Sequence, residues 1–296
     1  LTGILFNAPA VQILKPLLFG ILWGFGGLTF GLSMRYLGIS LGMSVALGLT
    51  LVFGALMPSI LISLIPSFFT GFFPGAPSLG VLFSTSSGQV TLAGVVLCLA
   101  GILINGKAGM MKDKEVSAEE KKEGVTEFNL KKGISVAVFS GLMNSAFAMG
   151  VASGKPLADI AKQNGTNPVF ENNPALLVIM FGGFLVNFVW CFYLQFKNKS
   201  ISDFGKAPIG ANILFCAIGG TLWYLQMFFF GMGESILKGV AGWSILMSSS
   251  ILFSTMWGLY SKEWKGIGSN TKMVLAAGLA VLIVSTIVFG IAKGMN

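Results

Sequence analysis

Long uncharged stretches alternate with short polar links along almost the whole chain. A helix needs about 20 residues to cross a bilayer while it satisfies its own backbone hydrogen bonds, and each stretch is close to that length. None of the stretches contains Asp, Glu, Lys or Arg. The pattern predicts an all-α polytopic membrane bundle with eight transmembrane helices, over residues 16–34, 41–64, 89–106, 133–153, 175–196, 208–232, 240–261 and 273–292.

The composition supports this prediction and removes several function classes. Only 30 of 296 residues are charged, 54% are apolar, and the mean hydropathy is +0.82. A soluble globular enzyme carries about a quarter charged residues, so that class is excluded. Histidine is absent, which removes histidine triads and histidine metal sites, and no cofactor or metal is expected. The cysteines Cys98, Cys191 and Cys216 match neither a zinc nor a disulfide spacing and are interpreted as packing residues.

The charges that remain are unevenly distributed. Residues 107–132 hold 13 of the 30 charges, and the chain divides there into 1–106 with three helices, a charged loop 107–132, and 133–296 with five helices. Alternate links carry 14 and 5 cations, which predicts a cytoplasmic charged loop and external chain ends. The cations lie in the links between membrane spans, and the seven lysines of the charged loop are mixed with six acids, so the sequence does not predict a nucleic-acid partner. The external link 66–87 is uncharged and rich in phenylalanine, and either lies in the membrane interface or caps the helices beneath it.

Glycines recur along one stripe of the first predicted helix. Gly20, Gly24, Gly27 and Gly31 follow one another at steps of four, three and four residues. Such a stripe lets another helix approach closely, either as static packing or as a sliding seam between moving bundles.

Polar and aromatic side chains at membrane depth mark a candidate site, because uncompensated polar groups are costly there. The candidates for substrate binding are Trp223, Tyr224, Gln226, Asn144 and Asn187. Amides beside indole rings suit a polyol, whose hydroxyls need hydrogen-bond partners while its C–H faces stack on aromatic rings. The alternative for each residue is a hydrogen bond between helices.

The links between helices hint at an internal repeat. The first three spans and the last three share a very short first link, at residues 37–40 and 233–239. A repeat of five helices would place its two copies in opposite orientation, which supports alternating access around a site at mid-depth. On that expectation two helices are missing from the front, and the chain by itself would be inactive.

Four short strings in register resemble the bacterial L-rhamnose–proton symporter family of the drug/metabolite transporter superfamily. They are Met34-Arg35-Tyr36-Leu37-Gly38, Glu127-Phe128-Asn129-Leu130-Lys131-Lys132-Gly133, Trp223-Tyr224-Leu225-Gln226 and Lys262-Glu263-Trp264. The resemblance implies ten helices in two inverted halves, a chain that starts near the third helix, an inner-membrane location, and uptake of a deoxy sugar coupled to protons.

A symporter needs a group whose protonation changes with sugar occupancy, and no carboxylate lies inside the predicted spans. Glu234, just past the sixth span, is the nearest acid to the polar cluster and the candidate for proton coupling. Alternatively, Glu234 is a solvated turn residue paired with Lys238 four residues on, and the proton carrier lies on the missing helices.

Three other functions stay open. An exporter or exchanger of another small metabolite could use the same scaffold, and a non-transporting membrane subunit could assemble through the glycine stripe. An intramembrane serine hydrolase is the weakest alternative, because its serine would need a base that the spans do not supply.

Overall fold

The computed structural model describes residues 2–37, 39–115, 129–205, 208–237, 240–260 and 267–295, which form helices and turns without a strand. Each predicted span falls on one long helix, with at most one of its residues beyond the helix, and most of the helices are longer than the spans by several residues. These helices are α2 (Ala10–Leu37), α3 (Ile39–Leu64), α6 (Ser86–Glu115), α8 (Leu130–Ser153), α10 (Asn173–Asn198), α11 (Ile209–Leu237), α12 (Val240–Tyr260) and α13 (Ser269–Gly294). In the described part, seven candidate membrane spans cover all of them except α12. The predicted all-α bundle is confirmed.

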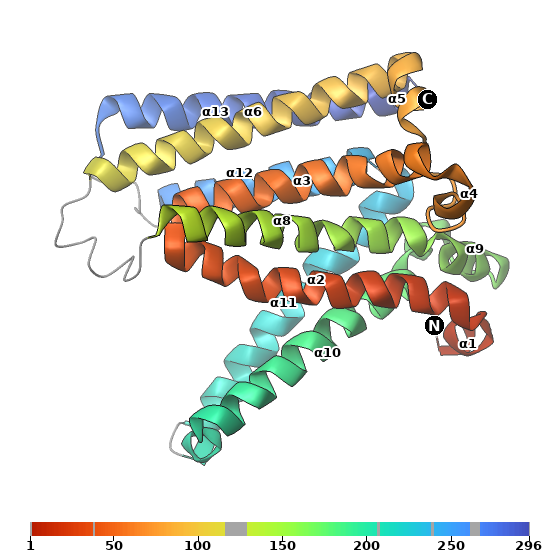
Figure 1. Cartoon of the computed structure of the whole chain (residues 1–296), viewed down its shortest axis with the longest axis horizontal. Coiled ribbons are helices and arrows are strands. Elements are labelled where there is room, and N and C mark those ends of the chain that lie inside the picture. Colours follow the sequence, from red (N-terminus) through yellow and green to blue (C-terminus); the bar gives the residue numbers. More distant parts are fainter. Residues whose placement is uncertain are drawn as a thin grey trace.

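Both chain termini and most of the short helices gather at one end of the bundle (Figure 1). The short helices at that end are α1 (Thr2–Asn7), α4 (Pro66–Phe69), α5 (Leu79–Ser84), α9 (Lys155–Gln163) and the turn η1 (Pro168–Phe170). At the opposite end α6 finishes, α13 begins, and η2 (Ile201–Gly205) joins α10 to α11. We call the end with the termini the external end, following the lysine count.

The long helices pack in a defined order. Helix α2 lies between α8 and α10, α3 lies between α8 and α6, and α6 runs alongside α13 (Figure 1). Helices α10 and α11 leave the bundle at a steep angle toward the cytoplasmic end. In the most apolar stretch of α11 only 6% of the residues are buried, against 50% in α3, so much of α11 has a lipid-facing surface in a membrane.

Only part of the predicted glycine stripe is a helix contact. A Cβ on Gly20 or Gly24 would overlap α10 at Ile179 or Val186. A Cβ on Gly27 or Gly31 would meet nothing within 4 Å, because α10 has already diverged from α2 there. The stripe therefore allows one close crossing of α2 and α10 near the external end and leaves the rest of α2 uncovered on that side.

The link 66–87 is partly a cap and partly surface. Phe73 is fully buried against Phe19, Ile62 and Met149, and Lys15 Nζ donates a 2.6 Å hydrogen bond to the Gly71 carbonyl. Phe83 is 63% exposed. The aromatic cap is thus the arrangement at Phe73, where it closes the external ends of α2, α3 and α8.

Two of the strings quoted for the family resemblance meet in space at the cytoplasmic end. The Asn129 N–H donates to the Tyr36 carbonyl at 3.0 Å, and the Asn129 side chain caps α8 by accepting from the Lys132 N–H at 3.0 Å. A Cβ on Gly133 would overlap the side chain of Leu37. These contacts join the end of α2 to the start of α8. Half of the charged loop, residues 116–128, and the string 262–264 lie outside the described residues.

Candidate functional site

Trp23 stands at the middle of α2 and at the meeting point of four helices. Its ring is nearly parallel to that of Trp223 on α11, with 5.8 Å between centroids and 5° between planes. Its other ring neighbour is Phe147 on α8, at 5.0 Å and 62°. On the α10 side it lies against Gly183, where a Cβ would overlap the indole. Side chains from α2, α8, α10 and α11 therefore converge at mid-depth.

The two predicted asparagines lie one helical turn from contacts of Trp23. Asn144 lies on the same face of α8 as Phe147. Its amide donates a 3.1 Å hydrogen bond to the Ser140 hydroxyl, and that hydroxyl donates in turn to the Gly26 carbonyl of α2 at 3.1 Å. Asn187 is one turn beyond Gly183 on α10 and donates to the Gly183 carbonyl at 2.8 Å. Both amides are half-buried and keep a carbonyl oxygen that can accept a further hydrogen bond.

The three predicted residues of α11 divide into two groups. Trp223 joins the aromatic contacts of Trp23 and is 45% exposed. Tyr224, one residue further round the helix, instead contacts Phe228 of its own helix with 6.4 Å between ring centroids. Gln226 is exposed. The structure thus brings Trp223, through Trp23, near the level of Asn144 and Asn187, while Tyr224 contacts only its own helix among the described rings and Gln226 is exposed.

Glu234 continues the face of α11 that carries Trp223. Residues at positions 223, 230 and 234 are spaced as i, i+7 and i+11, which keeps them on one side of a helix. Both Phe230 (9% exposed) and Glu234 (8% exposed) are buried. The Glu234 carboxylate lies against Gly242 of α12, where a Cβ would collide with it. Lys238, the alternative partner considered for Glu234, lies outside the described residues.

A cavity of about 240 Å³ opens beside Glu234 near the external end. Its apolar wall includes the rings of Phe230 and Trp243, and the Trp243 indole N–H donates to the Thr50 carbonyl at 3.3 Å. Its polar wall is formed by Lys155, Asp159, Lys162, Glu171, Asn172 and Glu234. We refer to this space as the external cavity.

The external cavity and the mid-depth cluster are joined by aromatic contacts. Phe147 lies 5.9 Å from Phe230 and 6.0 Å from Trp243 between ring centroids, and it also contacts Trp23. A continuous aromatic surface therefore leads from the cavity to Trp23 and Trp223. Rings with nearby amides and carboxylates suit a small hydroxylated molecule, and Glu234 adds a group that can exchange a proton.

Sequence reasoning missed several members of this arrangement. Trp23 lies in the interior of an apolar span, and that position was its signal, since tryptophan is more usual at the membrane interface. Trp243 is the fourth residue of its span, where a tryptophan is usual, and gave no such signal. Lys162 and Glu171 lie in an external link and form an ion pair that spacing alone does not reveal.

The cysteines and carboxylates were also considered as possible metal ligands. In the part of the chain that the structure describes, no group of three or more Cys, Asp or Glu could hold a metal ion. The cysteines are free, with Cys98 buried and Cys191 and Cys216 exposed.

Comparison with known proteins matches residues 6–295 to the family model described as L-rhamnose-proton symport protein. A protein from Cronobacter sakazakii named L-rhamnose-proton symporter is 35% identical over 295 residues, covering 97% of this chain and 80% of the relative. One of the same name from Citrobacter koseri is 37% identical over 288 residues, covering 94% of this chain and 78% of the relative. No solved structure matches the chain.

Proposed function

The chain belongs to the L-rhamnose-proton symport protein family, and on that premise we propose that it imports L-rhamnose or a related deoxy sugar together with protons by alternating access. It is a multi-pass protein of the bacterial inner membrane and a transporter, not an enzyme.

The observation that carries the proposal is the position of Glu234. Its carboxylate is 8% exposed and lines the external cavity beside Phe230 and Trp243. Burial of this degree removes most of the hydration of a carboxylate, which makes its charged form costly, and protonation removes that cost. A proton taken up by Glu234 from the external side would therefore favour a state in which α11 moves through the apolar bundle with its cargo. Release of the proton to the cytoplasm would reset the carrier.

The sugar site in this proposal consists of Trp223, Tyr224, Gln226, Asn144 and Asn187, with Trp23 added. The amides hydrogen-bond sugar hydroxyls, and the indoles of Trp23 and Trp223 contact the C–H faces of the ring. The nearly parallel indoles and the two half-buried asparagines one turn away support this assignment. Movement of α11 would bring Tyr224 and Gln226 to the sugar from the exposed side.

We also propose that residues 1–106 and 133–296 belong to two inverted repeats joined by the loop 107–132. Corresponding helices of the last three spans in each half contact one another, which supports this division. Helix α2 meets α11 through Trp23 and Trp223, which stand at the middle of their helices, α3 contacts α12, and α6 packs against α13. A site at the α2–α11 contact would lie at the repeat interface, at mid-depth in the membrane.

The test uses the full-length product of the gene, as wild type and as variants, in vesicles with labelled L-rhamnose and an imposed pH difference, acidic outside. Wild type should accumulate the sugar above its external concentration. Glu234→Gln should abolish this pH-driven accumulation but still exchange labelled for unlabelled sugar across the membrane. The matched control is Glu115→Gln, the same exchange at the cytoplasmic end of α6, which should accumulate sugar like wild type.

The other outcomes identify what would replace the proposal. If the Glu234→Gln variant accumulates rhamnose as wild type does, proton coupling resides elsewhere. If wild type carries no rhamnose but carries another metabolite, the scaffold serves a different cargo. A stable complex with other membrane proteins and no flux at all would favour the non-transporting subunit.

A further inference from the structure

We propose that the external cavity is an outer binding station for the sugar, separate from the mid-depth site and occupied before the sugar reaches Trp23 and Trp223. The inference rests on the proposed sugar transport and adds a second site to it. The cavity is bounded by α3, α8, α9, α11, α12 and the turn before α10, so it lies within the fold and not in a single loop.

The lining has the chemistry that a polyol requires. One wall presents the rings of Phe230 and Trp243, on which the apolar face of a sugar can stack. The other carries ammonium donors, carboxylate acceptors and the amide of Asn172, which together can bond hydroxyls that act as donor and acceptor. Two of the carboxylates, Glu171 and Glu234, are 7% and 8% exposed, so water competes little for their bonds.

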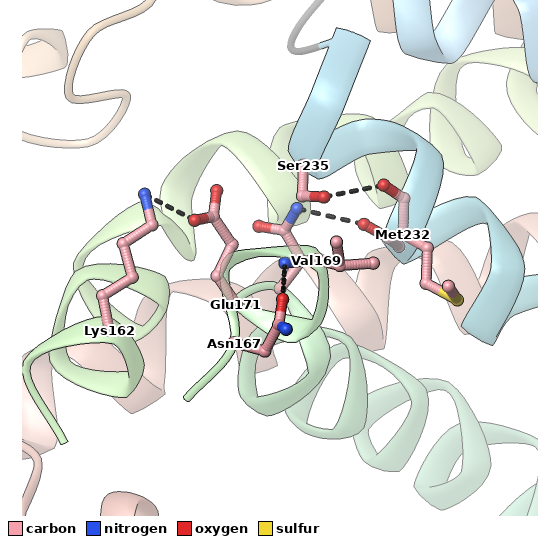
Figure 2. Close-up of polar contacts among 8 residues, drawn as sticks. Lys162, Asn167, Val169, Glu171, Met232 and Ser235 are labelled. Atoms are coloured by element: carbon pink, nitrogen blue, oxygen red, sulfur yellow. Dashed lines mark hydrogen bonds and ion pairs between the residues drawn. The ribbon is translucent and has the colours of Figure 1, made fainter. Parts of the chain in front are cut away.

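The polar wall is fixed in place by contacts with α11. Lys162 of α9 forms an ion pair with Glu171, which follows η1 (Figure 2). The turn that carries Glu171 is held to α11 by the Phe170 ring, 5.8 Å from that of Phe228, and by the Asn172 amide, which donates to the Gly231 carbonyl at 3.3 Å. The wall is therefore preorganised, which lowers the cost of binding.

The cavity is also separated from the mid-depth site by a measurable length of helix. Phe230 is seven residues, or about 10 Å of rise, from Trp223 on α11. A bound sugar cannot contact both levels at once, and the Phe147 ring lies between them. The two stations should therefore respond to different substitutions.

The experiment fills the cavity and measures uptake from each side. Ala152 lines the cavity on α8, and Ala152→Phe would occupy the space of the sugar. In right-side-out vesicles this variant should raise the external KM for L-rhamnose about tenfold or more, while the half-saturating internal concentration for efflux stays within about twofold of wild type. The matched control is Ala280→Phe, an exposed position on α13 away from the cavity, which should leave both values unchanged.

A second, milder variant distinguishes a loss of sugar binding from misfolding of the Ala152→Phe protein. Lys162→Gln keeps roughly the size of the wall and can still donate an amide hydrogen bond to Glu171, but it removes the ion pair and one charged donor. It should raise the external KM about tenfold while lowering the melting temperature by only a few degrees, because Glu171 is buried and loses its cation. The inference is overturned if both variants leave the external KM unchanged, or if influx and efflux are impaired equally. It is also overturned if only the pH dependence of uptake changes, because the cavity would then serve protons alone. Wild type that carries no rhamnose would instead refute the proposed function.

Discussion

The α6–α13 pair and the α2–α11 pair differ in how their helices meet. Between α6 and α13 contact is close along much of the length: Gly94 lies against Phe289, Gly101 against Leu282, and Gly278 against Asn105. Hydroxyls add to this contact, since Ser285 donates to the Gly94 carbonyl at 3.0 Å and Ser87 to the Ala292 carbonyl at 2.9 Å. Between α2 and α11 the rings of Trp23 and Trp223 stack on each other.

This difference indicates separate mechanical roles. Side chains that fit closely against the glycines of the facing helix would overlap with it if the helices slid, so α6 and α13 are expected to move as one unit. Two flat rings with 5.8 Å between centroids can separate or shift at a cost of about 1 kcal/mol. Helix α11, with its largely exposed surface and Glu234, is therefore the better candidate for the moving element.

Gly94→Leu should produce the largest effect on stability, because it places a side chain in the close contact between α6 and α13. A Cβ added at Gly94 would lie 2.7 Å from the Phe289 ring, and Phe289 is fully buried. Overpacking of this kind costs about 1–3 kcal/mol or more, which corresponds to a decrease of roughly 5 °C in melting temperature. Thermal unfolding of the purified protein measures it. Gly290→Leu, next to Phe289 but with nothing within 4 Å of its Cβ, is the control and should melt at or above the wild-type temperature.

Equal destabilisation by Gly94→Leu and Gly290→Leu would show that the glycines do not set the contact between α6 and α13. The distinction between a rigid and a mobile pair would then lose its basis.

Trp23→Ala should have an intermediate effect, on transport more than on folding. Loss of one stacking ring is worth about 0.5–1.5 kcal/mol, so the KM for rhamnose uptake should rise about three- to tenfold. Trp223→Ala should match it, because the two indoles act on the same sugar. Trp190→Ala removes a 46% exposed indole from α10 and serves as the control, with no change in KM expected. Unchanged KM values for both Trp23→Ala and Trp223→Ala would remove the pair from the binding site.

Glu115→Gln should have the smallest effect on stability, and it tests the polar link between the end of α6 and the start of α13. The Thr271 hydroxyl and the Gly268 N–H, both at 2.6 Å, lower the pKa of Glu115 below its ordinary value of 4.5. Because the folded-state pKa is depressed, this contribution to stability is present above pH 4.5 and is lost as pH falls through the folded value. We expect a melting temperature roughly 1–3 °C below wild type at pH 7.

The pH dependence checks the cause of that small shift. The difference between wild type and Glu115→Gln should shrink as the pH is lowered below 4.5, the ordinary pKa of the carboxyl. A difference that stays constant between pH 7 and pH 3 would mean that the Glu115 charge does not matter for the link to α13.

The spans were predictable because the bilayer applies one strong local rule. A stretch of about 20 residues without charge must be helical to satisfy its backbone in lipid, wherever its neighbours lie. Trp223 and Glu234 were also within reach of the sequence, since an indole and a carboxylate on one face of α11 follow from helical spacing. The glycine stripe was predicted only in part, because spacing identifies a face but not how far along that face a partner helix stays.

The rest of the site depended on pairs that are distant in the chain. Trp23 and Trp223 are 200 residues apart, and no feature of either segment predicts that the two rings will be in contact. The Lys162 and Glu171 ion pair needs α9 and η1 folded back toward each other, and Trp243 reaches the cavity only because α12 packs against α3.

The sequence by itself determined the membrane class, the helices, the site of the charged loop and the family, since hydropathy and short strings act locally. The tertiary structure decided which aromatic rings meet, that Glu234 is buried beside a cavity, and which glycines are in contact. The physical reason is the range of the forces involved. The bilayer acts on each segment separately, whereas van der Waals contact depends on helix crossing angles that only the assembled bundle fixes.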